Sequence, residues 1–398
     1  MSDFISNPFK PGAGRVPPEL AGRELLLESF AGLVRQVGVS GEGERPWVLS
    51  GLRGVGKTVL LNEFVRLARA DRWITVKIEA SAGQPLAVAL IRELNVVMRR
   101  HASLSERTAE ALKKAWGALR NFQLRFDPDG AVVGFQLGLQ NPVPGIADSG
   151  DLALDLEELL RTLAETAGEL GIGVLLAVDE MQEAPLADLA ALNVALHSLG
   201  QEGSPPPLVF IGAGLPSLPA VLASATSYAE RMFDYRSIGL LDNDATAQAL
   251  ASPAESNGVR WDADALAKVV EWTGGYPYFI QACGKHVWDV RATNVIDMGD
   301  AVLGTARARD EVDQGLYRSR LERVNASQRD LLNAMAASGD APVSIADLVV
   351  RTGKQRASDL SVARRELVKA GHIYVPERGY LAFTVPGMGD YLDRHPDR

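Results

Sequence analysis

One segment, Gly51 to Thr58, constrains this sequence more than any other. It reads Gly-Leu-Arg-Gly-Val-Gly-Lys-Thr and satisfies the pattern G-x-x-x-x-G-K-[ST] in full. Glycines let the backbone N–H groups of such a loop point inward around phosphates, and the N-terminus of a following helix attracts the same anion. Lys57 then supplies positive charge to the β- and γ-phosphates, and the Thr58 hydroxyl ligates Mg²⁺.

The residues on either side of this segment have the required pattern. Trp47 to Ser50 reads as a short buried strand, and Thr58 to about Ala70 reads as an amphipathic helix. We therefore predict that the loop and the first turn of the helix bind ATP or ADP with Mg²⁺. The residues expected to contact the nucleotide are Gly51, Arg53, Gly54, Val55, Gly56, Lys57, Thr58 and Val59.

A second motif, which is acidic, lies downstream of the loop. Val174 to Val178 is fully apolar and ends in Asp179 and Glu180, which places carboxylates at the end of a buried strand. We predict that Asp179 holds Mg²⁺ together with Thr58, and that Glu180 orients or activates the attacking water. Lys57, these two carboxylates and Arg231, discussed below, form the predicted catalytic set.

Strands alternate with helices through the first part of the chain, which predicts an α/β fold with a parallel sheet and helices on both faces. We assign residues 1–238 to this P-loop core. Within it, residues 118–150 break the rhythm, because 122–126 and 132–139 alternate apolar and polar residues around Asp127-Pro-Asp-Gly130. That pattern predicts an inserted β-hairpin.

The remainder of the chain has a different pattern. Residues 239–322 read as helical throughout and are assigned to a helical lid. Residues 323–398 show three short helices followed by two strands, at 373–376 and 380–385. Arg356, Arg364 and Arg365 lie in a locally basic stretch of this third part, and Arg378 lies between its two strands.

Two further short motifs resemble those of a known family. Leu20-Ala-Gly-Arg23-Glu resembles the h-h-G-R-E segment that borders the adenine in AAA+ and STAND ATPases, and Gly274-Gly-Tyr-Pro277 resembles the G-x-P element of the STAND lid. The resemblance is to archaeal-type and actinobacterial STAND or origin-recognition-like ATPases and covers nearly the whole chain. It implies that Arg23 and Pro277 face the nucleotide, that the C-terminal part is a winged helix, and that ATP hydrolysis drives a molecular switch.

Two features depart from this family pattern. Many AAA+ enzymes carry a polar residue after the strand expected at Leu208 to Ile211, whereas this chain reads Gly212-Ala-Gly214. The lid shows no obvious second sensor arginine. Arg231 and Arg236 are candidates for an arginine finger that acts on a neighbouring subunit, with a surface or interdomain salt bridge as the alternative.

The partner of the C-terminal part remains open. Arg356, Arg364, Arg365 and Arg378 could contact phosphates and base edges of duplex DNA. Alternatively, the module packs on the nucleotide domain or binds protein, in line with a formal net charge of −9. A homo-oligomer is possible as well.

The single cysteine, Cys283, excludes an intrachain disulfide and fits a reducing compartment, so we expect a cytoplasmic protein. The apolar runs are too short to cross a membrane, and no metal beyond Mg²⁺ is expected. A slow ATP-driven switch is the first functional hypothesis. A DNA-binding regulator or loader with a mainly structural nucleotide is the second, and a ring-forming motor is the third.

Overall fold

The computed structural model describes residues 6–12, 14–102, 110–112, 124–126, 132–135, 149 and 151–395. The chain divides into two compact units. The first, called the sheet unit below, comprises residues 25–50 and 57–237. The second, called the helical unit, comprises residues 1–24, 51–56 and 238–398, so the tip of the glycine-rich loop belongs to it.

A five-stranded parallel sheet forms the centre of the sheet unit, in the order β2-β5-β6-β1-β7. Its strands are β1 (Trp47–Ser50), β2 (Ile74–Glu79), β5 (Val174–Asp179), β6 (Leu208–Gly214) and β7 (Asp234–Ser237). This confirms the predicted α/β fold. Only β7 was not anticipated from the sequence, because its residues Asp-Tyr-Arg-Ser lack the apolar run of a buried strand.

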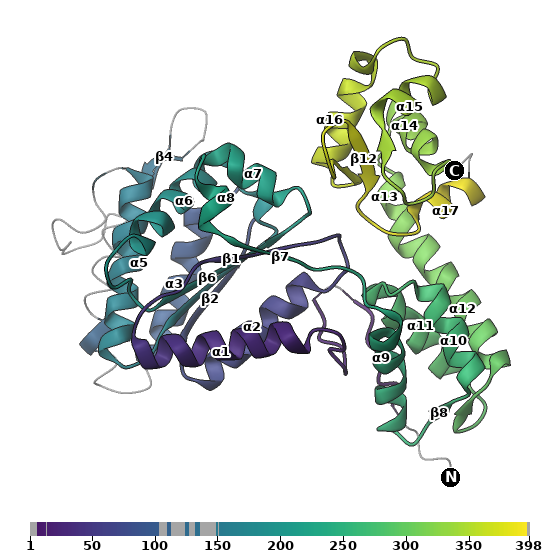
Figure 1. Cartoon of the computed structure of the whole chain (residues 1–398), viewed down its shortest axis with the longest axis horizontal. Coiled ribbons are helices and arrows are strands. Elements are labelled where there is room, and N and C mark those ends of the chain that lie inside the picture. The colour runs from purple at the N-terminus through teal and green to yellow at the C-terminus, as the bar shows by residue number, and fades with distance from the viewer. Residues whose placement is uncertain are drawn as a thin grey trace. The chain divides into compact units, whose positions relative to one another are not determined.

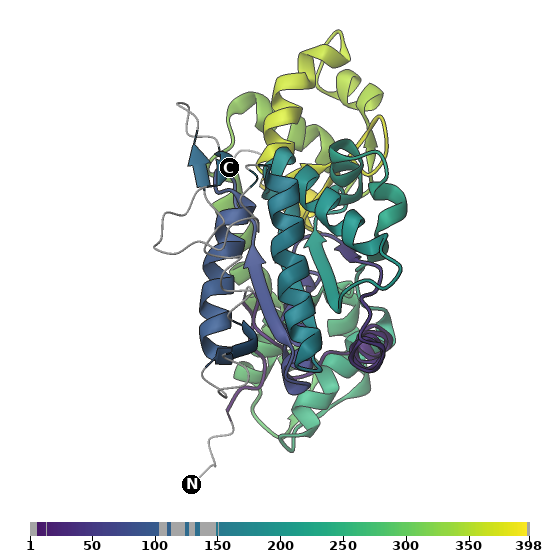
Figure 2. The same cartoon turned by 90° about the vertical axis from the view of Figure 1, so that its left-hand side faces the viewer.

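Helices cover both faces of this sheet, as the apolar character of its strands requires. On one face lie α1 (Glu24–Ser40) and α2 (Lys57–Ala70), and Phe30 of α1 stacks on Phe64 of α2 with ring centroids 4.3 Å apart. Figure 1 shows these two helices below the strands with α6 and α7 above them, and Figure 2 shows α1 nearly end-on. The helices of the other face are α3 (Leu86–Ala102), α5 (Leu152–Glu169), α6 (Leu186–Gly200) and α7 (Leu218–Ala225), and α8 (Ala229–Met232) follows them.

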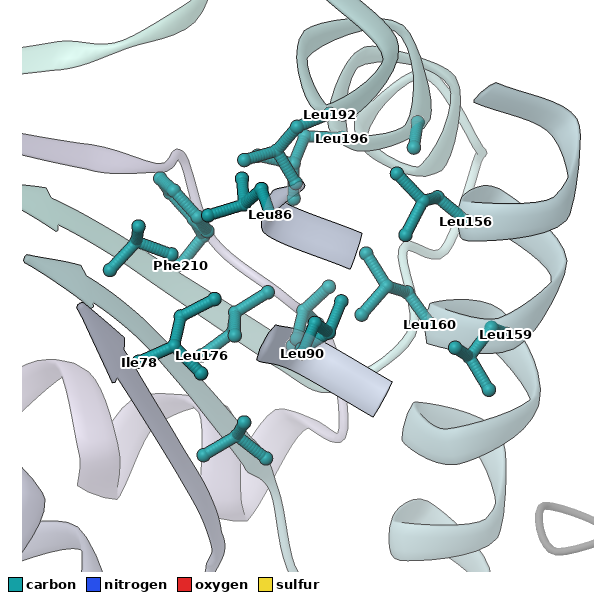
Figure 3. Packing of buried hydrophobic residues seen from close by; sticks show 14 of the residues in the cluster. Ile78, Leu86, Leu90, Leu156, Leu159, Leu160, Leu176, Leu192, Leu196 and Phe210 are labelled. Carbon is teal, nitrogen blue, oxygen red and sulfur yellow. The ribbon is translucent and has the colours of Figure 1, made fainter. Parts of the chain in front are cut away.

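The main hydrophobic core of the unit lies between the sheet and this second set of helices. Alternate residues of each strand point into it, for example Ile78, Leu176 and Phe210. Figure 3 shows them meeting leucines from α3, α5 and α6. Because a parallel sheet buries both faces, the residues of β5 are buried along its whole length, including Asp179 at its end.

The predicted inserted hairpin is present. β3 (Leu124–Phe126) and β4 (Val132–Phe135) pair antiparallel with a register irregularity at Phe126. The expected turn at 127–130 and the outer parts of the two predicted strands lie outside the described residues.

The helical unit contains a four-helix region with its own core. Its helices are α9 (Asn243–Glu255), α10 (Ala263–Thr273), α11 (Pro277–Val290) and α12 (Met298–Val312). Phe9, near the N-terminus, is buried in this core and packs edge-on against Trp288, with ring centroids 6.4 Å apart. The prediction of helix throughout was wrong at one place, because β8 (Arg260–Trp261) and β9 (Val295–Ile296) form a short parallel pair.

The last part of the chain begins after a π-helical segment, η2 (Asp313–Arg318), and a single turn, α13 (Ser319–Leu321). The three predicted helices are present as α14 (Ala326–Ala336), α15 (Ile345–Arg351), and η3 with α16 (Ala357–Leu360 and Ser361–Lys369). The two predicted strands, β11 (Ile373–Tyr374) and β12 (Tyr380–Phe383), pair antiparallel, and β10 (Val343–Ser344) extends the sheet to the order β10-β12-β11. A closing helix, α17 (Met388–Arg394), was not predicted.

No helix in the described parts of the chain combines the length and the apolar character needed to span a membrane.

Candidate nucleotide site

The glycine-rich loop connects β1 to α2, and Lys57 is the first residue of that helix. The Lys57 side chain is 5% exposed, which is unusual for a lysine and indicates a specific environment. Gly56, directly before it, has a φ of 97°, a value that residues with a Cβ rarely adopt. The loop therefore turns sharply into the helix, whose first N–H groups have no partner within the helix and are suited to a phosphate.

Thr58 and Asp179 come together as predicted. The Thr58 hydroxyl donates a hydrogen bond of 2.6 Å to Asp179 Oδ2, although 121 residues separate the two. Asp179 is the last residue of β5, is 2% exposed, and its Oδ1 accepts the backbone N–H of Glu180 at 3.0 Å. A hydroxyl beside a buried carboxylate is an all-oxygen donor set, which fits Mg²⁺ shared with nucleotide phosphates.

Glu180 follows directly and has a left-handed backbone, with φ 50° and ψ 38°. This conformation is uncommon for a residue with a Cβ, costs about 1–3 kcal/mol, and clusters at functional sites. It ends β5 abruptly and starts the 3-10 turn η1 (Met181–Glu183). As a result, the backbone turns away from the strand direction at Glu180, which is half-buried.

The glycines at the end of β6 have a structural cause. A Cβ on Gly212 would lie 2.1 Å from Met181 Sδ, and a Cβ on Gly214 would lie 2.4 Å from Gln182 Oε1. Side chains of η1 therefore occupy the space over the end of β6. This agrees with the sequence prediction that β6 itself offers no polar side chain at this point, and it shows that Gln182 supplies one instead.

The tip of the loop contacts other parts of the helical unit. Tyr276, which is buried next to the start of α11, donates its hydroxyl to the backbone carbonyl of Arg53 at 2.8 Å. Burial raises the pKa of this phenol, so it remains a donor at any physiological pH. Gly54 has a φ of 78°, and a Cβ there would lie 2.1 Å from the Tyr276 hydroxyl oxygen. Tyr276 and Gly54 are thus fitted to each other.

The C-terminal part reaches the same loop. The backbone N–H of Arg53 donates to the carbonyl of Thr384, just after β12, at 3.2 Å, and the Arg53 side chain lies against Gly371. His372 is 8% exposed. Burial, with the positive charges of Arg320 and Arg53 as further causes, lowers the pKa of His372 to about 4. Together with the bond from the Tyr276 hydroxyl to the Arg53 carbonyl, the bond to Thr384 means that both backbone groups of Arg53 are hydrogen-bonded within the helical unit.

Arg23 also points at the loop. Its Nη2 donates to the carbonyl of Gly239 at 2.6 Å and to the carbonyl of Val55 at 3.4 Å. Burial lowers the pKa of its guanidinium, and Glu24 opposes this. Pro277 is the first residue of α11, a position that suits a residue without an N–H. Its neighbour Tyr276, rather than Pro277 itself, makes the hydrogen bond to the loop.

The two arginine-finger candidates differ in their surroundings. Arg236 forms an ion pair with Asp234 at 2.8 Å and lies over the Trp47 ring at 3.5 Å, so it is engaged within its own sheet unit. Arg231, in α8, has an exposed side chain, and its backbone carbonyl accepts a hydrogen bond from Arg45. Of the two, Arg231 is the one placed to act outward, and its role as a finger stays a prediction.

The predicted DNA-contacting residues are spread over the C-terminal part. Arg356 precedes η3, Arg364 and Arg365 lie on α16, and Arg378 lies between β11 and β12. The side chains of Arg356, Arg365 and Arg378 are exposed, and Arg364 is half-buried. Arg351, from the same basic stretch, donates hydrogen bonds to the Ala334 carbonyl and to Ser338 Oγ, so its side chain links α15 to the end of α14.

Two residues important to this geometry were missed from the sequence, Tyr276 and Gln182. Tyr276 belongs to the Gly274-Gly-Tyr-Pro277 element, but the family resemblance singles out the proline of that element. Gln182 carries no recognisable spacing signal, because its role depends on glycines in a strand that lies about 30 residues further along the chain.

Two family models match parts of the chain. A family model described as an AAA ATPase domain matches residues 19–211, and one described as a domain of unknown function (DUF8462) matches residues 314–392. No curated protein sequence matches the chain.

Solved structures resemble the chain over almost its full length. The Walker-type ATPase PABY2304 of Pyrococcus abyssi is 18% identical with a TM-score of 0.59, and the match covers 96% of this chain and 99% of that one. The ORC2 protein of Aeropyrum pernix, solved in ADPNP–ADP complexes, is 14% identical with a TM-score of 0.57, covering 97% and 98%. Identities this low show the fold alone. Residues 19–211 are therefore similar to an AAA ATPase domain, and the chain has the fold of the archaeal ORC2 protein and of the Walker-type ATPase.

Proposed function

We propose that this protein binds and slowly hydrolyses ATP at residues 51–58 and acts as a nucleotide-dependent switch of the STAND or origin-recognition type. One observation carries the proposal. The backbone of Arg53, inside the phosphate-binding loop, is hydrogen-bonded on one side to Tyr276 and on the other to the carbonyl of Thr384. A ligand that rearranges the loop must therefore alter bonds to both the lid and the C-terminal part.

The chemistry follows from the groups in the sheet unit. Lys57 neutralises negative charge on the β- and γ-phosphates, and Glu180 orients a water and accepts its proton. Mg²⁺, when bound, would neutralise phosphate charge and would be held by Thr58 and Asp179. The 2.6 Å bond between Thr58 and Asp179 holds these two oxygen ligands in place beforehand.

The switch itself follows from differential binding. A nucleotide shifts a conformational equilibrium only by as much as its affinity differs between the two states. ATP and ADP differ by one phosphate at the loop, where Arg23, Tyr276 and Thr384 all bond to the loop backbone. We therefore assign the difference between the two states to these bonds. Pro277, next to Tyr276, would line the nucleotide from the lid.

The test is nucleotide binding followed by turnover. ATP and ADP should raise the melting temperature of the wild type, and Lys57→Ala should abolish the shift, because the positive charge at the phosphates is lost. Lys268→Ala, on the exposed face of α10, is the control. Glu180→Gln should retain binding and lose turnover by about 100-fold or more. A nucleotide-induced melting shift that persists unchanged in Lys57→Ala would refute the proposal.

The output of the switch is proposed to be DNA or protein binding through residues 323–398 as a winged helix. The helices α14, α15 and α16 with the sheet β10-β12-β11 support this assignment. In the winged-helix arrangement, η3 and α16 would face DNA, with Arg356, Arg364 and Arg365 on the phosphates and Arg378 at the tip of the wing.

Charge reversal tests the DNA output. Replacing Arg356, Arg364 and Arg365 by Glu should weaken duplex DNA binding and reduce the salt slope, by about 0.9 for each phosphate that is no longer neutralised. The same change at Arg260, Arg307 and Arg309, which belong to the lid, is the matched control. If the wild type shows no affinity for duplex DNA at low salt, or if both triple variants lose affinity equally, the specific DNA role fails and a protein partner remains.

The alternative, a DNA-binding regulator with a mainly structural nucleotide, is favoured by the absence of a polar side chain on Gly212–Gly214. Phosphate release with and without DNA separates the two.

The predicted role of Arg231 can be tested through its dependence on protein concentration. If it acts as a finger between subunits, Arg231→Ala should lower turnover only at protein concentrations at which the chain self-associates.

A further inference from the structure

Gln182 lies between the predicted catalytic carboxylate and the end of β6. Its side-chain Nε2 donates to Glu180 Oε2 at 2.5 Å, and its Oε1 accepts the backbone N–H of Leu215 at 3.1 Å. Because a backbone N–H can only donate, it fixes which end of the Gln182 amide is oxygen. The NH₂ end is thereby directed to Glu180.

The surrounding backbone is fitted to this arrangement. Gln182 Oε1 occupies space that a Cβ at position 214 would fill, since the two would be 2.4 Å apart. Met181 does the same at Gly212, where the distance to a built Cβ would be 2.1 Å. The end of β6 therefore lacks side chains so that η1 can lie over it, and the polar group at this position comes from η1.

Glu180 needs such a partner for a physical reason. Its side chain starts from a left-handed backbone position at the end of a strand and has several rotatable bonds. A charge-assisted hydrogen bond from a fixed amide selects one orientation and occupies one carboxylate oxygen. The other oxygen, Oε1, then remains to accept a proton from water.

We propose that Gln182 is a positioning residue that holds the Glu180 carboxylate in its water-activating orientation. This rests on the proposed function, in which Glu180 activates the water for ATP hydrolysis. In the reaction Gln182 acts through Glu180, so it contributes to the rate of the chemical step and not to nucleotide affinity.

Two variants test the role. Gln182→Met keeps the length of the side chain and removes its hydrogen bonds to Glu180 and Leu215 together with a longer one, of 3.5 Å, to Glu183 Oε1. Gln182→Glu keeps an acceptor for Leu215, removes the donor to Glu180 and places a second carboxylate beside it. Each should lower kcat for ATP at least about tenfold, as the loss of an orienting partner does elsewhere. KM for ATP and the melting shift caused by ADP should stay within about twofold of the wild-type values. Gln201→Met, at an exposed glutamine of the same unit, is the control.

A double-mutant comparison gives the decisive readout. If Gln182 works through Glu180, adding Gln182→Met to Glu180→Gln should cause almost no further loss of kcat. A tenfold loss in both backgrounds would overturn the proposal, because Gln182 would then act independently. An unchanged kcat in the two single variants would also overturn it, while leaving the proposed ATPase function intact.

Failure of the proposed function has a different signature. A wild type that binds ATP but releases no phosphate would remove the hydrolytic role of Glu180 and the role of Gln182 with it. Should Gln182→Met fail to fold, Gln182→Glu carries the same comparison, because it retains the bond to Leu215 that anchors η1 to the end of β6.

Discussion

The two ends of the phosphate-binding loop are held in different ways. At its C-terminal end, in the sheet unit, the contact is between side chains, the Thr58 hydroxyl and the Asp179 carboxylate. At its tip, in the helical unit, the loop contributes backbone groups, the N–H and C=O of Arg53 and the C=O of Val55. Side-chain chemistry leaves a signature in the sequence, whereas a backbone group is available at any residue. The first end carries the proposed catalytic groups, and the second is suited to transmitting the state of the loop.

The largest effect should come from breaking the side-chain end. Thr58→Val removes the hydroxyl and leaves Asp179 buried without this donor, so we expect ATP turnover to fall about 100-fold with loss of its Mg²⁺ dependence. Phosphate release measured over a Mg²⁺ titration checks this. Thr293→Val, at an exposed threonine of the helical unit, should have no effect. An unaltered Mg²⁺ dependence in Thr58→Val would contradict the assignment.

The backbone end can be broken at Gly54. Gly54→Ala places a Cβ 2.1 Å from the Tyr276 hydroxyl on a backbone with a φ of 78°. Strain at such a φ costs about 1–3 kcal/mol, and the steric conflict adds to it. We expect ADP affinity, measured by calorimetry, to fall more than tenfold. Gly83→Ala is the matched control, because Gly83 has a φ of 84° and no heavy atom within 4 Å of the built Cβ. Equal losses of ADP affinity in the two variants would show that Tyr276 does not constrain the loop.

His372, in the helical unit, allows a test through the pH dependence of stability. Its pKa is lowered to about 4 by burial and by Arg320 and Arg53, whereas an unfolded histidine titrates near 6.5. Above about pH 6.5 both states are neutral and the full stability is present. As the pH falls from there toward 4, the His372 imidazole becomes protonated in the unfolded state but stays neutral in the folded state. About 1–3 kcal/mol of the free energy of unfolding is therefore lost.

Urea unfolding between pH 7.5 and pH 4 measures this loss. His372→Leu cannot titrate and should flatten the dependence of unfolding free energy on pH in that window, while His395→Leu serves as the comparison. An identical slope in wild type and His372→Leu would mean that another group is responsible.

The smallest effect is expected for Tyr276→Phe. This variant removes one hydrogen bond to the Arg53 carbonyl and keeps the ring, so about 0.5–1.5 kcal/mol is at stake. We expect a two- to tenfold weaker affinity for ADP. Tyr278→Phe, two residues further along the chain, should leave ADP affinity unchanged. If the two variants behave alike, the lid does not act on the loop through this bond.

How much of the site could be predicted from the sequence depends on whether a contact requires a particular side chain or only a backbone group. The loop motif, Asp179 and Glu180 could be proposed from the sequence because phosphate and Mg²⁺ binding demand particular residue types at fixed spacing. The parallel sheet was predicted from the alternation of apolar strands with helices. The strand β7 was missed because its residues are polar and its place beside β1 depends on contacts distant in the chain. Gln182 was missed because a glutamine beside two glycines becomes meaningful only when η1 lies over the end of β6.

The sequence by itself determined that this chain has a P-loop and an acidic pair at the end of a buried strand, and that an α/β core precedes helical elements. These properties depend on local residue type and periodicity, which are written directly in the chain. Only the tertiary structure decided that Tyr276, and not Pro277, bonds to the loop, that Thr384 bonds to Arg53, and that Gln182 bonds to Glu180. These contacts join positions far apart in the chain or depend on the direction of a side chain, and residue type fixes neither.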